Sequence, residues 1–220
     1  MINISDTVMH VLNEDEVALE ALREGLLNFS AYAEKINARI ADLAMKPVKK
    51  GTIVVALTRM KKGIKEAPTL RQPIQIENLS VKSSLSVYTY EKTLEIQRKI
   101  AVLHPFSLPI NDLVSITEGS SEVTIVVADK SSQVLKKHFS VNPLVQYSDV
   151  AAITVQFMKK FATTPNFLYS LFSVLASKRI NIIEVVSTYT EMTFIVKKED
   201  MTSTVSAFNT YFVRKDENEK

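Results

Sequence analysis

The side chains that most often carry catalysis or bind metals are few and scattered in this chain. His10, His104 and His138 lie far apart, and none has a second ligand or a carboxylate at the spacing of a metal site. There is no cysteine, which excludes disulfides, thiolate zinc sites and a cysteine nucleophile. No GxSxG, SxxK, GxGxxG or GxxxxGKS/T pattern accompanies the many serines and threonines. The sequence therefore predicts a protein that is not an enzyme and uses neither a metal nor a cofactor.

A basic segment is a stronger candidate for a functional site, because it could bind an anionic partner. The net charge of the chain is +3, but residues 39–71 hold nine basic and two acidic side chains. The stretch SAYAEKINARIADLAMKPVKKGTIVVALTRMKK (30–62) has the pattern of a helix-turn-helix, and the strand-like PIQIENLSV (73–81) could be its wing. In this interpretation Thr52 and Arg59 would reach base edges, and Lys49, Lys50, Lys61 and Lys62 would contact phosphates.

The same lysines have a plainer interpretation. Lysines beside a helix end are often solvated or complement the helix dipole. The connection MKPVKKG is also longer than the roughly three to four residues that usually join the helices of this motif. Contact with DNA and a solvated basic face therefore stay open as alternatives.

Helical patterns account for about the first 65 residues. Val8, Val11 and Leu12 form an apolar stripe, Asn13 before the acids EDE predicts a helix start, and Ser30 predicts the cap of another helix. Two further helices would each bury one face. Their predicted inward residues are Ala33, Ile36, Ile40 and Leu43 in one helix, and Ile53, Ala56, Leu57 and Met60 in the other.

From Pro68 onward the chain reads as two units of the same order, strand, helix, strand, strand, helix. The stretch DLVSITEGSSEVTIVVADKS (112–131) matches NIIEVVSTYTEMTFIVKKED (181–200) at an offset of 69 residues. IQIENLSV and LSVYTY alternate apolar with polar residues, which predicts two half-buried strands before the first helix of the repeat. The corresponding helix of the second unit would be capped by Thr164 and begin at Pro165, with a buried stripe of Leu168, Leu171, Phe172 and Leu175.

The second unit carries an ordered series of pieces, ITVQFMKKFATTP, NFLYSLFSVLASKR, INIIEVVSTYTE and MTFIVKKED. This series resembles an ACT domain and is most similar to the regulatory ACT pairs of aspartate kinases. The resemblance covers roughly residues 82–212 and is diffuse in the first unit. Asn166 and Arg179 stand where the family usually has glycine, and the kinase domain that ordinarily precedes such a pair is absent.

The resemblance implies an amino-acid site between two units, held by backbone N–H groups before the first helix and by the asparagine of INI. Helix-start N–H groups offer donors to a carboxylate, and an amide can serve both a carboxylate and an ammonium. The plainer alternative is that Asn181 caps a turn and Thr163–Thr164 only start the helix; its aligned position in the first unit is Asp112. The implied ligand-binding residues are Met158, Thr163, Asn166, Phe167, Leu168, Asn181 and Ile182.

Together these patterns predict an α+β protein. We expect an N-terminal helical, winged helix-turn-helix-like domain (1–72), then two ferredoxin-like βαββα, ACT-like units (73–140 with its preceding strand, and 141–213), and a charged tail (214–220). The N-terminus lacks a signal peptide, and no apolar run approaches the roughly 18 residues of a membrane span, so a cytoplasmic protein is expected.

The predicted function is amino-acid-sensing regulation, with control of transcription as one hypothesis. One alternative is a stand-alone regulatory subunit that docks on an amino-acid biosynthetic enzyme, and another is an interaction module without a ligand. The expected partners are an amino-acid effector, DNA in the transcriptional hypothesis, and a second copy of the chain. Homodimerisation is expected because paired sheet edges would cover exposed edge strands.

Overall fold

Two units make up the chain, an N-terminal unit of residues Met1–Gln72 and a C-terminal unit of residues Pro73–Lys220. The computed structural model describes residues 3–64, 74–103 and 113–214. No helix within these residues is long and apolar enough to cross a membrane. The predicted α+β class is confirmed for the C-terminal unit, whereas the N-terminal unit is helical in the part that is described.

Four helices form the described part of the N-terminal unit: α1 (Ile4–Asn13), α2 (Glu16–Arg23), α3 (Phe29–Ala44) and α4 (Lys50–Ile64). The predicted inward residues of α4 are confirmed, since Ile53, Ala56 and Leu57 are buried and Met60 packs against the same core. In α3 the inward face ends at the buried Ala44. Leu43 is 41% exposed, so its predicted inward position is wrong.

The helix caps differ from the predicted ones. Asn13 is the last residue of α1, and the Asp15 side chain caps α2 by accepting a hydrogen bond from the Ala18 N–H at 3.0 Å. The α3 cap is Asn28, whose side chain accepts from the Ala31 N–H at 3.1 Å. Both predicted caps, Asn13 and Ser30, are therefore wrong. In each case another side-chain oxygen, two residues away in the chain, satisfies a free N–H of the first turn.

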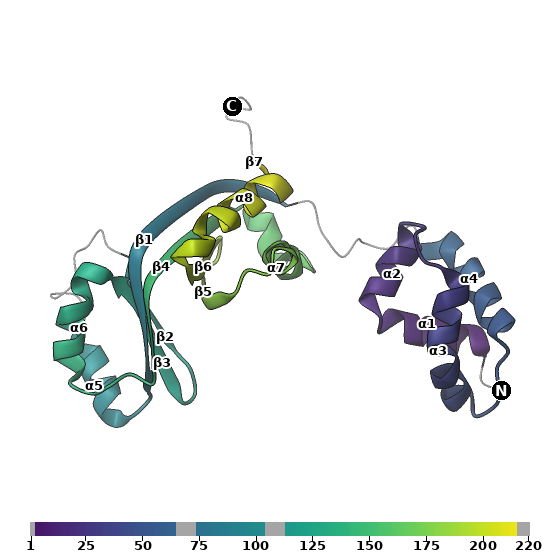
Figure 1. The fold of residues 1–220 in the computed structure, drawn as a ribbon, viewed down its shortest axis with the longest axis horizontal. Helices are drawn as coiled ribbons and strands as arrows, with labels where there is room; N and C mark the ends of the chain where they lie inside the picture. The colour runs from purple at the N-terminus through teal and green to yellow at the C-terminus, as the bar shows by residue number, and fades with distance from the viewer. Residues whose placement is uncertain (1–2, 65–73, 104–112, 215–220) are drawn as a thin grey trace. The chain divides into compact units, whose positions relative to one another are not determined.

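The C-terminal unit contains the predicted strand, helix, strand, strand, helix order twice, and these halves are called the first and second repeats (Figure 1). The first repeat consists of β1 (Gln75–Glu91), α5 (Leu94–Leu103), β2 (Ser115–Glu118), β3 (Glu122–Ala128) and α6 (Ser132–Phe139). The second consists of β4 (Val145–Phe157), α7 (Phe167–Ser177), β5 (Ile182–Ser187), β6 (Glu191–Lys197) and α8 (Met201–Tyr211). The strands form one sheet in the order β2-β3-β1-β4-β6-β5, with β7 (Val213–Arg214) paired to β1.

The central strands β1 and β4 are antiparallel and belong to both repeats. The first half of β1 pairs with the second half of β4, as in Leu79 opposite Val155, and β3 and β6 flank the pair. Each long strand has one left-handed residue at a corresponding place, Ser84 with φ 59° and Asp149 with φ 54°. Register shifts lie beside both residues, so the backbone bends there instead of breaking into two strands.

Two predictions for this region are therefore wrong. IQIENLSV and LSVYTY are one strand, β1, because the bend at Ser84 lets pairing continue through the change in direction. The predicted wing lies within this segment, and its residues pair with β4 in the sheet of the C-terminal unit. Residues 75–81 of the predicted wing therefore belong to the sheet of the C-terminal unit.

Each repeat has its own helix-covered core. In the first repeat α5 and α6 cover Tyr88, Tyr90 and Ile125. In the second, α7 and α8 cover β4 and β6, as Figure 1 shows. The predicted stripe of α7 holds for Leu171 and Leu175, but Leu168 is 52% exposed and Phe167 is buried instead. A smaller apolar cluster joins the repeats on the other sheet face: Leu85, Val87, Val126, Val150, Ala152 and Ile195.

Candidate functional site

The connection from β4 to α7 has an unusual backbone course. After Phe157 the chain makes a short 3-10 helix, η2 (Lys159–Thr163), and then reaches Asn166 in the left-handed conformation with φ 63°. Asparagine tolerates this conformation better than most residues, which explains how Asn166 can adopt it although it is not glycine. Thr164 is not the cap of α7, because its hydroxyl donates to the Lys160 carbonyl oxygen at 2.9 Å.

The turn between β5 and β6 faces this connection. The Thr188 N–H donates to the Glu191 carbonyl oxygen at 2.9 Å and closes the turn. The Phe157 N–H donates to the Thr190 carbonyl oxygen, also at 2.9 Å, so the end of β4 is tied to the same turn. These bonds fix the β5–β6 turn against the end of β4, where the connection to α7 begins.

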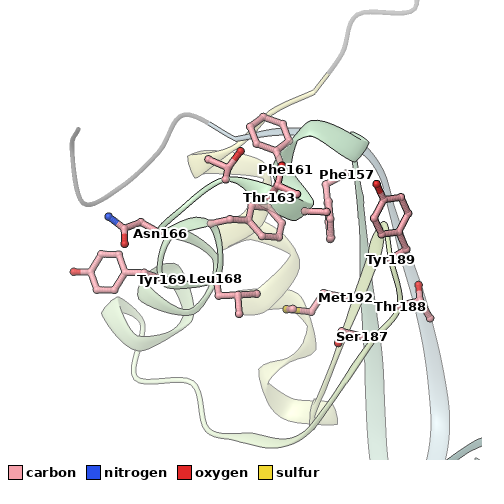
Figure 2. Close-up of a pocket in the computed structure, with 13 residues that line it drawn as sticks. Phe157, Phe161, Thr163, Asn166, Leu168, Tyr169, Ser187, Thr188, Tyr189 and Met192 are labelled. Carbon is pink, nitrogen blue, oxygen red and sulfur yellow. The ribbon is translucent and has the colours of Figure 1, made fainter. Parts of the chain in front are cut away.

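A cavity of about 630 Å³ lies between the two segments (Figure 2). Figure 2 shows the Leu168 and Met192 side chains directed toward one another, whereas those of Asn166 and Tyr169 are directed away from Met192. The volume lies within the range of about 300–1,000 Å³ that is typical of small-molecule pockets. Its lining residues are Phe157, Phe161, Ala162, Thr163, Thr164, Asn166, Phe167, Leu168, Tyr169, Ser187, Thr188, Tyr189 and Met192.

The lining is aromatic and contains no aspartate, glutamate, lysine or arginine among the described residues. The ring centroids of Phe157 and Phe167 are 4.4 Å apart, and those of Phe161 and Phe167 are 5.9 Å apart. Leu168 and Tyr189 are 52% and 64% exposed, so apolar surface reaches the opening. The polar contribution comes from hydroxyls and one amide. Such a site can bury an uncharged group while its rim offers hydrogen bonds.

The cavity brings together four of the seven predicted ligand-binding residues, Thr163, Asn166, Phe167 and Leu168. Met158 follows β4 directly and packs against the core of the second repeat, outside the lining. Asn181 and Ile182 are not in the lining. They follow the C-terminal end of α7, whereas the cavity lies at its start. Asp112, the counterpart of Asn181, lies outside the described residues.

Sequence reasoning did not include the β5–β6 turn in the site. Ser187, Thr188 and Tyr189 contribute to the lining although they follow Asn166 by more than twenty residues. The available signal was the run STYT, which combines hydroxyls with an aromatic side chain between two apolar strands. Its position beside α7 depends on strand pairing, which the run itself does not reveal.

The predicted nucleic-acid contacts lie in or beside α4. Lys49, Thr52, Arg59 and Lys61 have exposed side chains. Lys50 is exposed as well, but its ammonium pairs with the Glu34 carboxylate at 2.7 Å, so α3 offsets part of its charge. Lys62 belongs to α4, but its side chain is not among those that the structure describes. Within the described residues, no group of three or more histidine or acidic side chains could hold a metal ion.

No protein-family model and no curated protein matches this chain. Aspartate kinase from Clostridium acetobutylicum is similar to it in structure, with a TM-score of 0.52, 15% identity, and coverage of 64% of this chain and 36% of that chain. The ligand-free regulatory subunit of aspartate kinase from Thermus thermophilus has a TM-score of 0.50, 14% identity, and coverage of 64% and 99%. The corresponding values for the Thermus flavus regulatory subunit are 0.52, 11%, 62% and 98%.

These likenesses show the fold. The chain contains an α+β architecture shared with regulatory subunits of aspartate kinases, as expected for ACT-like domains. It spans about a third of the length of the Clostridium enzyme. The helix-turn-helix interpretation of residues 1–72 stays a prediction.

Proposed function

We propose that this chain is an amino-acid-sensing regulatory protein whose effector binds in the cavity of the second repeat. The observation that carries the proposal is the cavity of about 630 Å³ at the start of α7. The first N–H groups of a helix lack intrahelical partners and favour anionic groups, so the start of α7 can receive a carboxylate. The likeness to regulatory subunits of aspartate kinases supports a sensing role.

The N-terminal unit is the proposed output element. In this proposal Thr52 and Arg59 read base edges, while the lysines at 49, 50, 61 and 62 contact phosphates. The exposed side chains of Lys49, Thr52, Arg59 and Lys61 support it. A ligand would act by having different affinities for two arrangements of the protein, since equal affinities shift no equilibrium.

A stand-alone regulatory subunit is the second candidate function. The likeness extends over 99% of the Thermus thermophilus regulatory subunit and 98% of the Thermus flavus one, so such a fold can form a whole subunit. In this alternative the chain docks on an amino-acid biosynthetic enzyme. A third alternative, an interaction module without a ligand, is favoured only if no amino acid binds.

A thermal-shift screen of the full chain against the twenty amino acids tests the sensing proposal. A ligand at 100 times its Kd stabilises the folded state by about 2.7 kcal/mol. Leu168→Asp should abolish the shift, because it places a carboxylate at the opening. Leu94→Asp is the matched control, since Leu94 is 73% exposed in the first turn of α5.

Asn181→Ala separates the cavity from the site that the family resemblance implies. If the effector binds in the cavity, this variant should keep the wild-type shift. Loss of binding in Asn181→Ala with retention in Leu168→Asp would move the site to the start of β5. Absence of a shift with every amino acid would refute the sensing proposal.

A gel-shift titration tests the DNA proposal. Lys49→Glu/Lys62→Glu should weaken DNA binding and reduce its dependence on salt, because fewer counterions are released. Lys137→Glu/Lys178→Glu makes the same charge change at exposed positions of the C-terminal unit and should have little effect. If the wild type gives no gel shift even at low salt, the docking-subunit alternative replaces the DNA proposal.

We also propose that the chain forms a homodimer. The outer strands of the sheet are β2 and β5, and an edge strand offers unpaired backbone groups to a partner. The apolar residues of β5 are only half-buried, which favours this edge. Light scattering should give twice the chain mass. A proline at Val185 should shift the mass toward the monomer, and a monomeric wild type would refute the proposal.

A further inference from the structure

We infer that the cavity of the second repeat selects an amino acid with a large, uncharged, apolar side chain and rejects acidic and basic ones. The inference rests on the proposed sensing function and names the class of effector. Its basis is the chemistry of the walls, which are rich in rings and free of charge.

The apolar wall is formed by side chains that also pack in the core of the second repeat. Phe157, Phe161 and Phe167 are each no more than 7% exposed, and Met192 is 5% exposed. Phe167 contacts both other rings, so the three rings form one connected surface. A side chain of matching character gains by leaving water, and a methionine sulfur adapts well to an apolar or aromatic neighbour.

A charged side chain would find no compensating group in this wall. The described lining contains no ionisable side chain other than the tyrosines. Lys160, next to Phe161 in the chain, holds its ammonium 5.0 Å from the centre of the Phe161 ring and is not part of the lining. Burying an ammonium or carboxylate without a partner is costly, so lysine, arginine, aspartate and glutamate should be excluded.

Hydroxyl groups line the rim of the cavity from both of its sides, the β4–α7 connection and the β5–β6 turn. Thr163, Ser187 and Thr188 are exposed and line the cavity. The Thr163 hydroxyl donates to the Lys160 carbonyl oxygen at 3.4 Å and can still accept a hydrogen bond. A hydroxyl can both donate and accept, which suits an ammonium as well as a carboxylate. The first turn of α7 begins at Phe167, on the Thr163 side of the cavity. The Phe167 N–H donates to the Thr164 carbonyl oxygen at 3.3 Å, and the N–H groups that follow it in this turn add donors of the peptide backbone. This division places the charged end of the effector at the rim and its side chain against the rings.

Isothermal titration calorimetry of the full chain tests the selection. The probes are L-phenylalanine, L-leucine, L-lysine, L-glutamate and glycine. We expect L-phenylalanine or L-leucine to bind, with L-lysine and L-glutamate weaker by about 100-fold or more, because a buried charge lacks a partner. Glycine should be weaker by about tenfold or more, because it has no side chain to bury.

A charge-introducing variant tests the same point from the protein side. Leu168→Glu should reduce binding of L-phenylalanine or L-leucine by at least about tenfold and lower the preference over L-lysine, because a carboxylate then faces the cavity. Folding should be retained, since an acid in the first helical turn complements the dipole. Leu94→Glu, in the first turn of α5, is the matched control and should leave binding unchanged.

The outcomes separate the inference from the proposed function. Binding of L-lysine or L-glutamate as tight as that of the apolar probes would overturn the inference while preserving amino-acid sensing. Equal binding of glycine would do the same, because the ring wall would then contribute nothing. Failure of all twenty amino acids to bind would overturn the sensing proposal itself.

Discussion

The two repeats share a backbone plan but differ where the first strand meets its helix. In the first repeat the Lys92 N–H donates to the Ser121 carbonyl oxygen at 2.8 Å. In the second the Phe157 N–H donates to the Thr190 carbonyl oxygen at 2.9 Å. Each bond ties the β-hairpin turn to the residue at the end of the central strand. The scaffold around the cavity is therefore present twice.

The two repeats differ in the residue at this bond and in the connection that follows it. In the first repeat only Lys92 and Thr93 separate β1 from α5. The Lys92 ammonium donates to the Gly119 carbonyl oxygen at 3.0 Å and lies 3.0 Å from the Glu118 carboxylate, closing the turn onto the helix start. In the second repeat Phe157 and the longer stretch 158–166 stand there instead. The cavity of the second repeat therefore accompanies a longer connection and a phenylalanine in place of the bridging lysine.

The largest predicted effect tests whether the repeats are stable independently. Phe194 is fully buried, and its ring lies 5.5 Å from that of Phe172 and 5.3 Å from that of Phe208. Phe194→Ala should cost about 3–5 kcal/mol of unfolding free energy, because it leaves a cavity. Since β1 and β4 serve both repeats, hydrogen exchange should accelerate in β3 as well as in β6.

Ile125→Ala is the reciprocal variant, because Ile125 is the buried counterpart in β3 of the first repeat. It should cost about 2–5 kcal/mol and accelerate exchange in β6 too. Faster exchange confined to the substituted repeat would show that the two repeats unfold separately despite their shared strands.

The second prediction concerns the lysine bridge that closes the first repeat. Lys92→Met keeps the length of the side chain and removes its charge, so the bond to the Gly119 carbonyl oxygen and the Glu118 pair are lost. We expect a loss of about 0.5–1.5 kcal/mol, measured by urea unfolding. A double-mutant cycle with Glu118→Gln should assign less than about 1 kcal/mol to the pair, because both groups are partly exposed. A coupling energy above the total loss would contradict this division.

Prediction from the sequence succeeded for elements that one periodic pattern defines. The inward face of α4 and the βαββα order follow from local spacing, and both are confirmed. Prediction failed where a residue distant in the chain determines which side chain caps a helix. Asp15 caps α2 while Lys35 of α3 holds its other oxygen at 2.9 Å, which local spacing before α2 does not reveal.

The residues of the candidate site fall into the same two groups, those that local sequence predicts and those that distant strand pairing brings to the site. Pro165 predicted the start of α7 to within two residues, since the helix begins at Phe167 and its cap is Asn166 instead of Thr164. Thr188 and Tyr189 were not predicted, because only pairing of β5 with β6 and of β6 with β4 brings their turn to that helix. The sequence pattern placed Leu168 in a buried stripe, but its side chain is exposed. Helical periodicity alone cannot distinguish a core position from the wall of an open cavity.

The third prediction uses the two left-handed residues that flank α7. Arg179 has φ 56° and an exposed side chain, so its backbone carries the cost of this conformation without an evident contact in return. Arg179→Gly should raise the unfolding free energy by about 0.5–1 kcal/mol, because glycine adopts positive φ readily. Asn166→Gly should change it less, because asparagine already tolerates the left-handed region. Thermal unfolding checks both, and a destabilised Arg179→Gly would reveal a contribution from the arginine side chain.

The smallest expected effect compares the edge strands of the two repeats. Glu184 in β5 pairs opposite Ile195, and Ser115 occupies the matching place in β2 opposite Val126. Burial raises the pKa of the Glu184 carboxyl above its ordinary value, and a hydrogen bond from the Val185 N–H opposes this in part. As pH rises through the unfolded-state pKa, the unfolded chain loses this proton first, so stability falls until the pH exceeds the folded-state pKa.

Glu184→Gln should therefore be more stable than the wild type near pH 7, with the difference vanishing near pH 4. Ser115→Glu should create the same pH-dependent loss in the first repeat, because that position is also half-buried on an outer strand. Urea unfolding between these two pH values measures both differences. A Glu184→Gln difference that does not change with pH would show that the carboxylate is as well solvated in the folded chain as in the unfolded one. The edge of β5 would then be an open surface, and its difference from β2 would lie in side-chain identity alone.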